Sequence, residues 1–135
     1  MNFLVSREHN NKEMSKKLFI EAFYTQFGEF IGELSKMYPD DKDFTSFGTN
    51  LSIMKYMNPM YPINFIKTDV IDKFDDKIIS RDESFFLNNK DIQQSADIDI
   101  IYKLKNYITD MSPQNKESVW SYIEIITKIT KKILE

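Results

Sequence analysis

Aromatic and aliphatic residues repeat at steps of three and four near the start of the sequence. The repeat begins at Phe19 and continues through Phe23, Phe27, Phe30, Leu34 and Met37. An α-helix makes one turn every 3.6 residues, so this spacing places all six side chains on one face. Pro39 ends the pattern, because the residue before a proline is biased away from helical backbone. The sequence therefore predicts a long amphipathic helix from Asn10 to Tyr38, preceded by a short polar leader over about residues 1–10.

The same period returns along the rest of the chain. It predicts helices over residues 44–57, 62–74 and 97–108, a short helix within the irregular segment 75–96, and a last helix from 113 onward. Asp41 or Asp43 is expected to cap the second helix, and Pro62 to occupy the first position of the third. Ser112 followed by Pro113 is a strong helix start signal.

Turn-forming residues are scarce, which decides the fold class. Only 3 glycines and 4 prolines occur in 135 residues, too few for the frequent turns of a β-sandwich or barrel. A hydrophobic content of 41% is typical of a globular chain, and the length fits one domain. We expect an all-α protein: a single compact bundle of about five to six helices over residues 1–135. The core should include Phe23, Phe27, Phe30, Leu34, Ile123 and Ile126.

The chain has few of the side chains that catalysis and metal binding use. The absence of cysteine excludes thiol catalysis, disulfides and zinc fingers, and His9 is the single histidine. No glycine-rich phosphate loop or nucleophile motif occurs. Carboxylates remain, and an enzyme built on Asp40, Asp72, Asp75 or Asp82 would need them to converge on one pocket. We therefore expect a protein that is not an enzyme, with no cofactor and no metal.

The net charge of the chain argues against nucleic acid as a partner, but the position of the basic residues keeps it as an alternative. The formal net charge is −3, and only Arg7 and Arg81 supply the guanidinium that phosphate recognition favours. The middle of the chain is acidic, whereas residues 1–20 and 101–135 each have two more basic than acidic side chains. Antiparallel packing of the first and last helices would bring these basic ends together. The alternative function is thus a nucleic-acid-associated factor that uses its basic N- and C-terminal helices.

Aromatic residues are more numerous than a core of this size needs, and some are expected at an interface. The segment RDESFFL places two adjacent phenylalanines beside charged residues. Neighbouring helical residues diverge by about 100°, so one ring of the pair should be at least partly exposed or reach a satellite cluster. Alternatively, the segment is extended and both rings fold over the helices as a lid. The candidate partner-contact residues are Arg81, Asp82, Glu83, Phe85, Phe86 and Trp120.

Several segments in order form a pattern: FGEFIGELSKMYPDDKDF, an Asn-Pro turn, DKIISRDESFFL and SPQNKESVWSYIEII. This pattern, from Phe27 to Ile126, resembles that of small uncharacterised all-helical proteins encoded by large DNA viruses of algae and protists. The resemblance implies a virion-associated or host-cell role. It supplies no catalytic signature and no functional residues.

The leading functional prediction is a non-catalytic protein that binds other proteins, as an adaptor or minor structural component of a larger assembly. Its partners would be other proteins, in a homo- or hetero-oligomer. No apolar run reaches the roughly 20 residues of a membrane span, and no signal peptide is visible. We therefore expect a cytoplasmic protein, found in the host cytoplasm or the virion if it is viral.

Overall fold

The computed structural model describes the backbone of residues 3–87 and 100–135, and side chains from Asn11 onward within those ranges. Throughout these residues the regular structure is helical, which confirms the predicted all-α bundle. The elements are α1 (Phe3–Met37), α2 (Asp43–Met57), α3 (Met60–Phe65), the π-helical η1 (Ile66–Ile71), α4 (Asp72–Ile79), α5 (Ser84–Leu87), α6 (Ile100–Leu104), the 3₁₀-helical η2 (Ile108–Asp110) and α7 (Pro113–Ile133).

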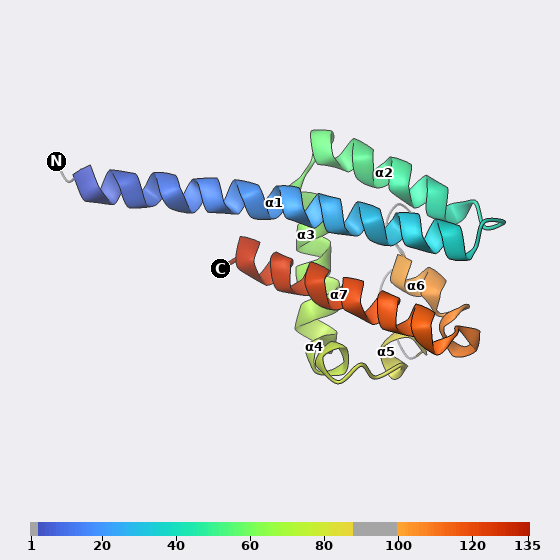
Figure 1. Cartoon of the computed structure of the whole chain (residues 1–135). Coiled ribbons are helices and arrows are strands. Elements are labelled where there is room, and N and C mark those ends of the chain that lie inside the picture. The colour runs from blue at the N-terminus through green and yellow to red at the C-terminus, as the bar shows by residue number, and fades with distance from the viewer. Residues whose placement is uncertain (1–2, 88–99) are drawn as a thin grey trace.

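The long helix α1 is the centre of the arrangement. It lies between α2 and α7, and α7 runs antiparallel to it (Figure 1). The elements α3, η1 and α4 follow one another in a column that crosses α1 and α7 at a steep angle (Figure 1). This column packs against α7 through η1 and α4. The first and last helices therefore meet along one side, as the sequence suggested.

The core lies where α1, α2, α7 and the crossing column meet. All six residues predicted for it are buried in one cluster: Phe23, Phe27, Phe30, Leu34, Ile123 and Ile126. Phe30 stacks on Tyr122 of α7, with 5.3 Å between ring centroids. The periodic stripes of α1 and α7 thus face each other, and the core prediction is confirmed.

The N-terminal part of the chain differs from the expected polar leader. Helix α1 begins at Phe3, seven residues before the predicted start at Asn10. Residues 3–13 contain neither glycine nor proline, so nothing interrupts helix propagation into this polar stretch. The N-terminal part of α1 projects beyond the end of α7 (Figure 1). Every described side chain from Asn11 to Leu18 is exposed, so this part of α1 forms an arm outside the bundle.

The helix starts agree with the sequence at α7 and differ at α2. Ser112 caps α7, its hydroxyl accepting a hydrogen bond from the third helical amide, and Pro113 is the first helical residue. At α2 the cap position is Lys42, so neither Asp41 nor Asp43 occupies it. The Asp41 carboxylate instead accepts a hydrogen bond from the amide of Asp43, the first helical residue, at 3.1 Å. A carboxylate one position earlier therefore satisfies a free amide of the first turn.

The start of α3 also differs from the prediction. It begins at Met60, with Pro59 at the cap and Pro62 at the third helical position instead of the first. Amides of the first turn have no partner within the helix, so a proline is tolerated there as well. After α3 the chain continues in the wider π-helical turns of η1. It then bends at Phe74, whose φ of −135° is not helical.

The helix predicted over residues 97–108 ends earlier than expected. Its start lies outside the described residues, as does the polar segment 88–99 before it. Helix α6 ends at Leu104, and three residues later Tyr107 stacks on Tyr38 with 3.9 Å between ring centroids. The short helix expected within 75–96 is present as α5.

Candidate protein-binding surface

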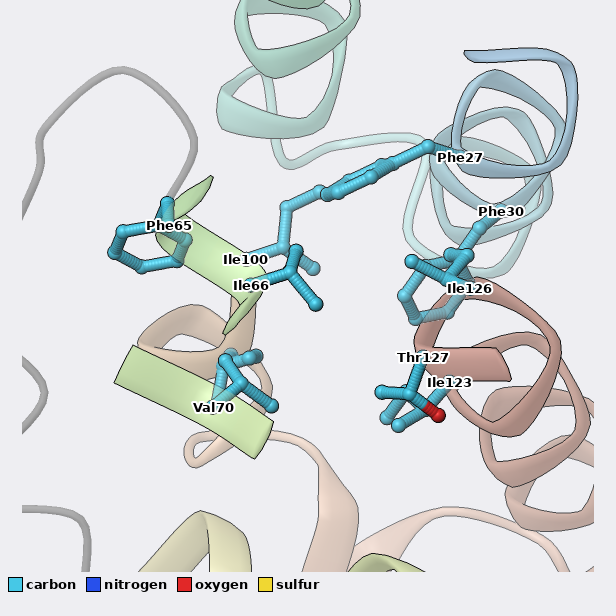
Figure 2. A pocket seen from close by; sticks show the side chains of 10 residues that line it. Phe27, Phe30, Phe65, Ile66, Val70, Ile100, Ile123, Ile126 and Thr127 are labelled. Atoms are coloured by element: carbon cyan, nitrogen blue, oxygen red, sulfur yellow. The ribbon is translucent and has the colours of Figure 1, made fainter. Parts of the chain in front are cut away.

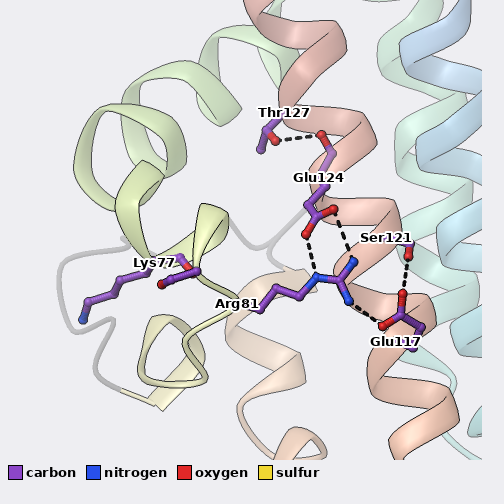
Figure 3. A network of polar contacts seen from close by, with 7 residues as sticks. Lys77, Arg81, Glu117, Ser121, Glu124 and Thr127 are labelled. Carbon is purple, nitrogen blue, oxygen red and sulfur yellow. Dashed lines mark hydrogen bonds and ion pairs between the residues drawn. The ribbon is translucent and has the colours of Figure 1, made fainter.

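Arg81 is the first residue of the segment predicted to contact a partner. Its guanidinium pairs with carboxylates of the same chain. Its backbone has a φ of +54°, in the left-handed region that non-glycine residues seldom adopt. Its Nε donates to Glu124 Oε1 at 2.6 Å, and its Nη1 to Glu117, both on α7 (Figure 3). The bond to Glu124, followed by that to Glu117, raises the pKa of Arg81, and the guanidinium lowers the pKa of Glu124. Arg81 thus holds the corner between α4 and α5 against α7.

The two acidic residues that follow Arg81 are also engaged locally. Asp82 accepts a hydrogen bond from the amide of Ser84 at 2.9 Å, which satisfies a free amide at the start of α5 and lowers the pKa of Asp82. Glu83 pairs with Lys116 of α7 at 2.6 Å. All three charges of this segment therefore serve to fix its position.

Phe85 and Phe86 are both fully buried in the main core, so neither ring is exposed or part of a satellite cluster, and that expectation is wrong. Phe85 packs edge-on against Phe74 of α4, and Phe86 lies 5.1 Å from the Trp120 ring of α7. Adjacent rings do diverge around α5, but this helix has neighbours on more than one side: α4, α6 and α7. The alternative lid interpretation correctly predicts that both rings are buried. Its extended conformation is wrong, because Ser84–Leu87 is helical. Trp120 is buried as well.

Two of the four carboxylates that an enzyme would need are engaged in separate ion pairs. Asp72 pairs with Lys67, and Asp75 with Lys131 of α7. Within the part of the chain that the structure describes, no group of three acidic or histidine side chains is placed to hold a metal ion. Likewise, no helix among the described residues is long and apolar enough to cross a membrane.

A cluster that the sequence analysis missed joins the turn after α1 to the end of α6. The hydroxyl of Tyr107 donates to Asp41, and Lys103 pairs with Asp41 at 2.9 Å and with Asp43 at 2.7 Å. Burial alone would raise the pKa of Asp41, but the hydrogen bonds from Tyr107 and Lys103 lower it. Because Asp41 and Lys103 are far apart in sequence, no local pattern indicates this contact. These contacts hold the turn after α1 and the start of α2 against the end of α6.

A small cavity lies within the core, beside η1. Its lining is apolar except for Thr127, whose hydroxyl donates to the backbone oxygen of Glu124 (Figures 2 and 3). Side chains of Ile66 and Val70 from η1 face Ile123 of α7 across it (Figure 2). Its volume of about 30 Å³ is that of a packing defect and leaves no room for a substrate or cofactor.

Large exposed apolar side chains occur on the arm of α1 and on the outer face of the last turns of α2. Met14 and Leu18 on α1 are 64% and 66% exposed, and Ile53, Tyr56 and Met57 on α2 are 50%, 86% and 81% exposed. Lys55 Nζ lies 3.0 Å from Glu21 Oε2, which places the last turn of α2 beside α1, one turn beyond Leu18. We call these five side chains the apolar end.

No family model matches this chain, and no significant match to it is found among curated proteins or solved structures.

A groove lies between the arm of α1 and the end of α7, on the α7 side of the arm. Lys12, Lys16 and Phe19 line it from α1, and Lys132 and Ile133 line it from α7. Its volume is about 520 Å³, far larger than the core cavity. We call this surface the lysine groove. It brings together the two basic ends that the sequence analysis described.

Sequence reasoning expected some exposed aromatic side chains, but it placed them at Phe85, Phe86 and Trp120, which the structure buries. The structure instead exposes Tyr56 and Met57 at the end of α2. Nothing local separates them from Tyr24, which is buried and donates a hydrogen bond to the Pro59 carbonyl at 2.6 Å. The exposed groups were therefore identifiable by type, and only packing distinguishes them from the buried ones.

Proposed function

We propose that this protein is a non-catalytic protein-binding module whose apolar end contacts another protein in a larger assembly. The observation that carries the proposal is the exposure of Tyr56 and Met57, both more than four-fifths exposed. Single exposed apolar residues are ordinary, but a gathering of large ones is typical of an interaction site. Tyrosine and methionine are enriched at protein interfaces.

The placement of these residues supports the proposal. In α2 the apolar residues Phe44, Phe47 and Leu51 face the core, while Ile53, Tyr56 and Met57 lie on the other side of the helix. The C-terminal part of α2 is thus apolar on both faces, and the bundle covers only one of them. Burying a side chain of this size against a partner contributes roughly 1.5–3 kcal/mol. Association itself costs several kcal/mol, so the surface around these side chains must also contribute to the contact.

The test compares two double variants of surface residues. Tyr56→Ser with Met57→Ser removes the centre of the apolar end, and Ile79→Ser with Leu87→Ser removes exposed apolar side chains elsewhere. We expect the wild-type protein and the Ile79/Leu87 variant to form the same complex, measured by sedimentation velocity and by capture from the native source. The Tyr56/Met57 variant should keep its helical circular dichroism and lose the complex. A wild-type protein that stays monomeric and captures the same proteins as the Tyr56/Met57 variant would contradict the proposal.

The cellular setting of this role remains a proposal too. We place it in the cytoplasm, or in the host cytoplasm or virion if the resemblance to proteins of large DNA viruses reflects its origin. Identifying the proteins that purify with the native chain would test that setting directly.

A nucleic-acid-associated role is a second candidate, which the lysine groove favours. Lys12, Lys16 and Lys132 come from both ends of the sequence and line one groove. A phosphate site made of lysines must give an affinity that falls steeply with salt concentration. Anisotropy titration with single- and double-stranded DNA and RNA, at low and moderate salt, would decide this candidate.

A further inference from the structure

The lysine groove has unused positive charge. Lys12 and Lys16 are four residues apart, on the same face of α1. Within residues 11–87 and 100–135, no carboxylate pairs with either of them. On the opposite wall, Lys132 pairs with Glu135 at 3.4 Å, and both side chains are exposed. Such exposed pairs contribute little and exchange readily for another carboxylate.

The groove also has an apolar floor. Phe19 is half-buried and packs against the core, and Ile133, the last residue of α7, is buried. An apolar floor between lysine side chains matches a peptide in which an apolar residue is flanked by acidic ones. The aliphatic stems of the lysines extend this apolar surface while their ammonium groups stay in water.

We propose that the lysine groove binds an acidic segment of a partner protein, with one aromatic or aliphatic side chain of that segment seated between Phe19 and Ile133. This inference rests on the proposed function, because it takes the partner to be a protein. It adds the chemistry by which that partner is recognised: carboxylates opposite Lys12 and Lys16, and an apolar anchor. Complementary charge of this kind selects the partner and speeds association, while the anchor supplies affinity.

Two features favour a peptide over nucleic acid in this groove. Glu13 and Glu135 also line it, and both would repel phosphate groups, whereas a peptide can place a basic or neutral residue beside them. The apolar floor lies below the charges, where a peptide side chain reaches more readily than a phosphate backbone.

Fluorescence anisotropy with four labelled probes tests the proposal. The first probe is a ten-residue peptide of glutamates with a central phenylalanine, and the second has serine in place of that phenylalanine. The third has lysines in place of the glutamates, and the fourth is oligodeoxythymidine. We expect the first probe to bind best and the second at least threefold more weakly. The affinity of the first should fall at least threefold between about 50 and 200 mM salt, as screening shortens the range of charge interactions.

Charge variants locate the site. Lys12→Glu with Lys16→Glu should weaken binding of the first probe at least tenfold, and Lys12→Gln with Lys16→Gln by a smaller factor. The matched control is Lys36→Glu with Lys42→Glu, which makes the same charge change at exposed positions away from the groove. This control should bind within twofold of the wild type. All variants should retain the wild-type circular dichroism, because the substituted side chains are exposed.

Three results would overturn the proposal: no binding of the first probe at millimolar concentration, tighter binding of oligodeoxythymidine than of the first probe, or equal loss in the Lys36/Lys42 control. The Tyr56/Met57 variant separates this proposal from the proposed function. It should bind the acidic probe normally even though it fails to assemble. Loss of assembly with intact peptide binding supports both proposals, whereas intact assembly without peptide binding contradicts the lysine groove alone.

Discussion

Replacing Phe86 by alanine removes a ring that is completely buried between α5 and α7. The ring lies 5.1 Å from Trp120 and 5.0 Å from Phe85, centroid to centroid, so its loss opens a cavity in a cluster of three aromatic side chains. Truncating a buried phenylalanine costs about 3–5 kcal/mol, because both transfer energy and packing are lost. Domains of this size unfold with roughly 5–15 kcal/mol, so the variant should retain only part of its stability.

Urea unfolding measures this loss directly. Trp120 is the single tryptophan, and its fluorescence reports on this cluster, while far-ultraviolet circular dichroism reports on the helices. Phe86→Leu should cost less than half as much, since leucine fills most of the space. The exposed neighbour Leu87 is the control, and its alanine variant should lose about 1 kcal/mol or less. Suppose that the free energy of unfolding of Phe86→Ala lies within about 1 kcal/mol of the wild-type value but the variant no longer assembles. The ring then faces a partner, and our account of its packing is wrong.

Three further changes test other parts of the structure. Val70→Ile adds a methylene toward the core cavity and should raise the free energy of unfolding by about 0.8 kcal/mol, measured by urea denaturation. A destabilised variant would show that the cavity has no room for the added group. Glu124→Gln removes the more buried of the two carboxylates on Arg81, so it should lower the melting temperature more than Glu117→Gln does, and the opposite order would contradict the network in Figure 3. The folded state lowers the pKa of Asp41, so its stabilising effect is full above the ordinary carboxyl pKa and is lost as the pH falls. Stability measured from pH 5 to pH 2 should therefore fall less steeply in Asp41→Asn than in the wild type, and an equal slope would place the acid sensitivity elsewhere.

The sequence by itself determined the fold class and the longest helices. The stripe of α1 has a three-four period, and Pro39 ends it. Ser112 and Pro113 specify the start of α7 through a side-chain cap and a preset φ. These signals act between residues a few positions apart, so they can be read without knowing the rest of the fold.

Only the tertiary structure decided which apolar side chains remain exposed. RDESFFL was predicted to expose a ring because one local rule was applied to a helix that has neighbours on several sides. Tyr24 and Tyr56 have the same side chain and both lie on helices, yet the first is buried beside Pro59 and the second projects into solvent. Helix formation depends on neighbours along the chain, whereas burial depends on contacts between residues far apart in sequence. The sequence therefore predicted most of the helices of this chain, and packing alone determined which side chains remain exposed.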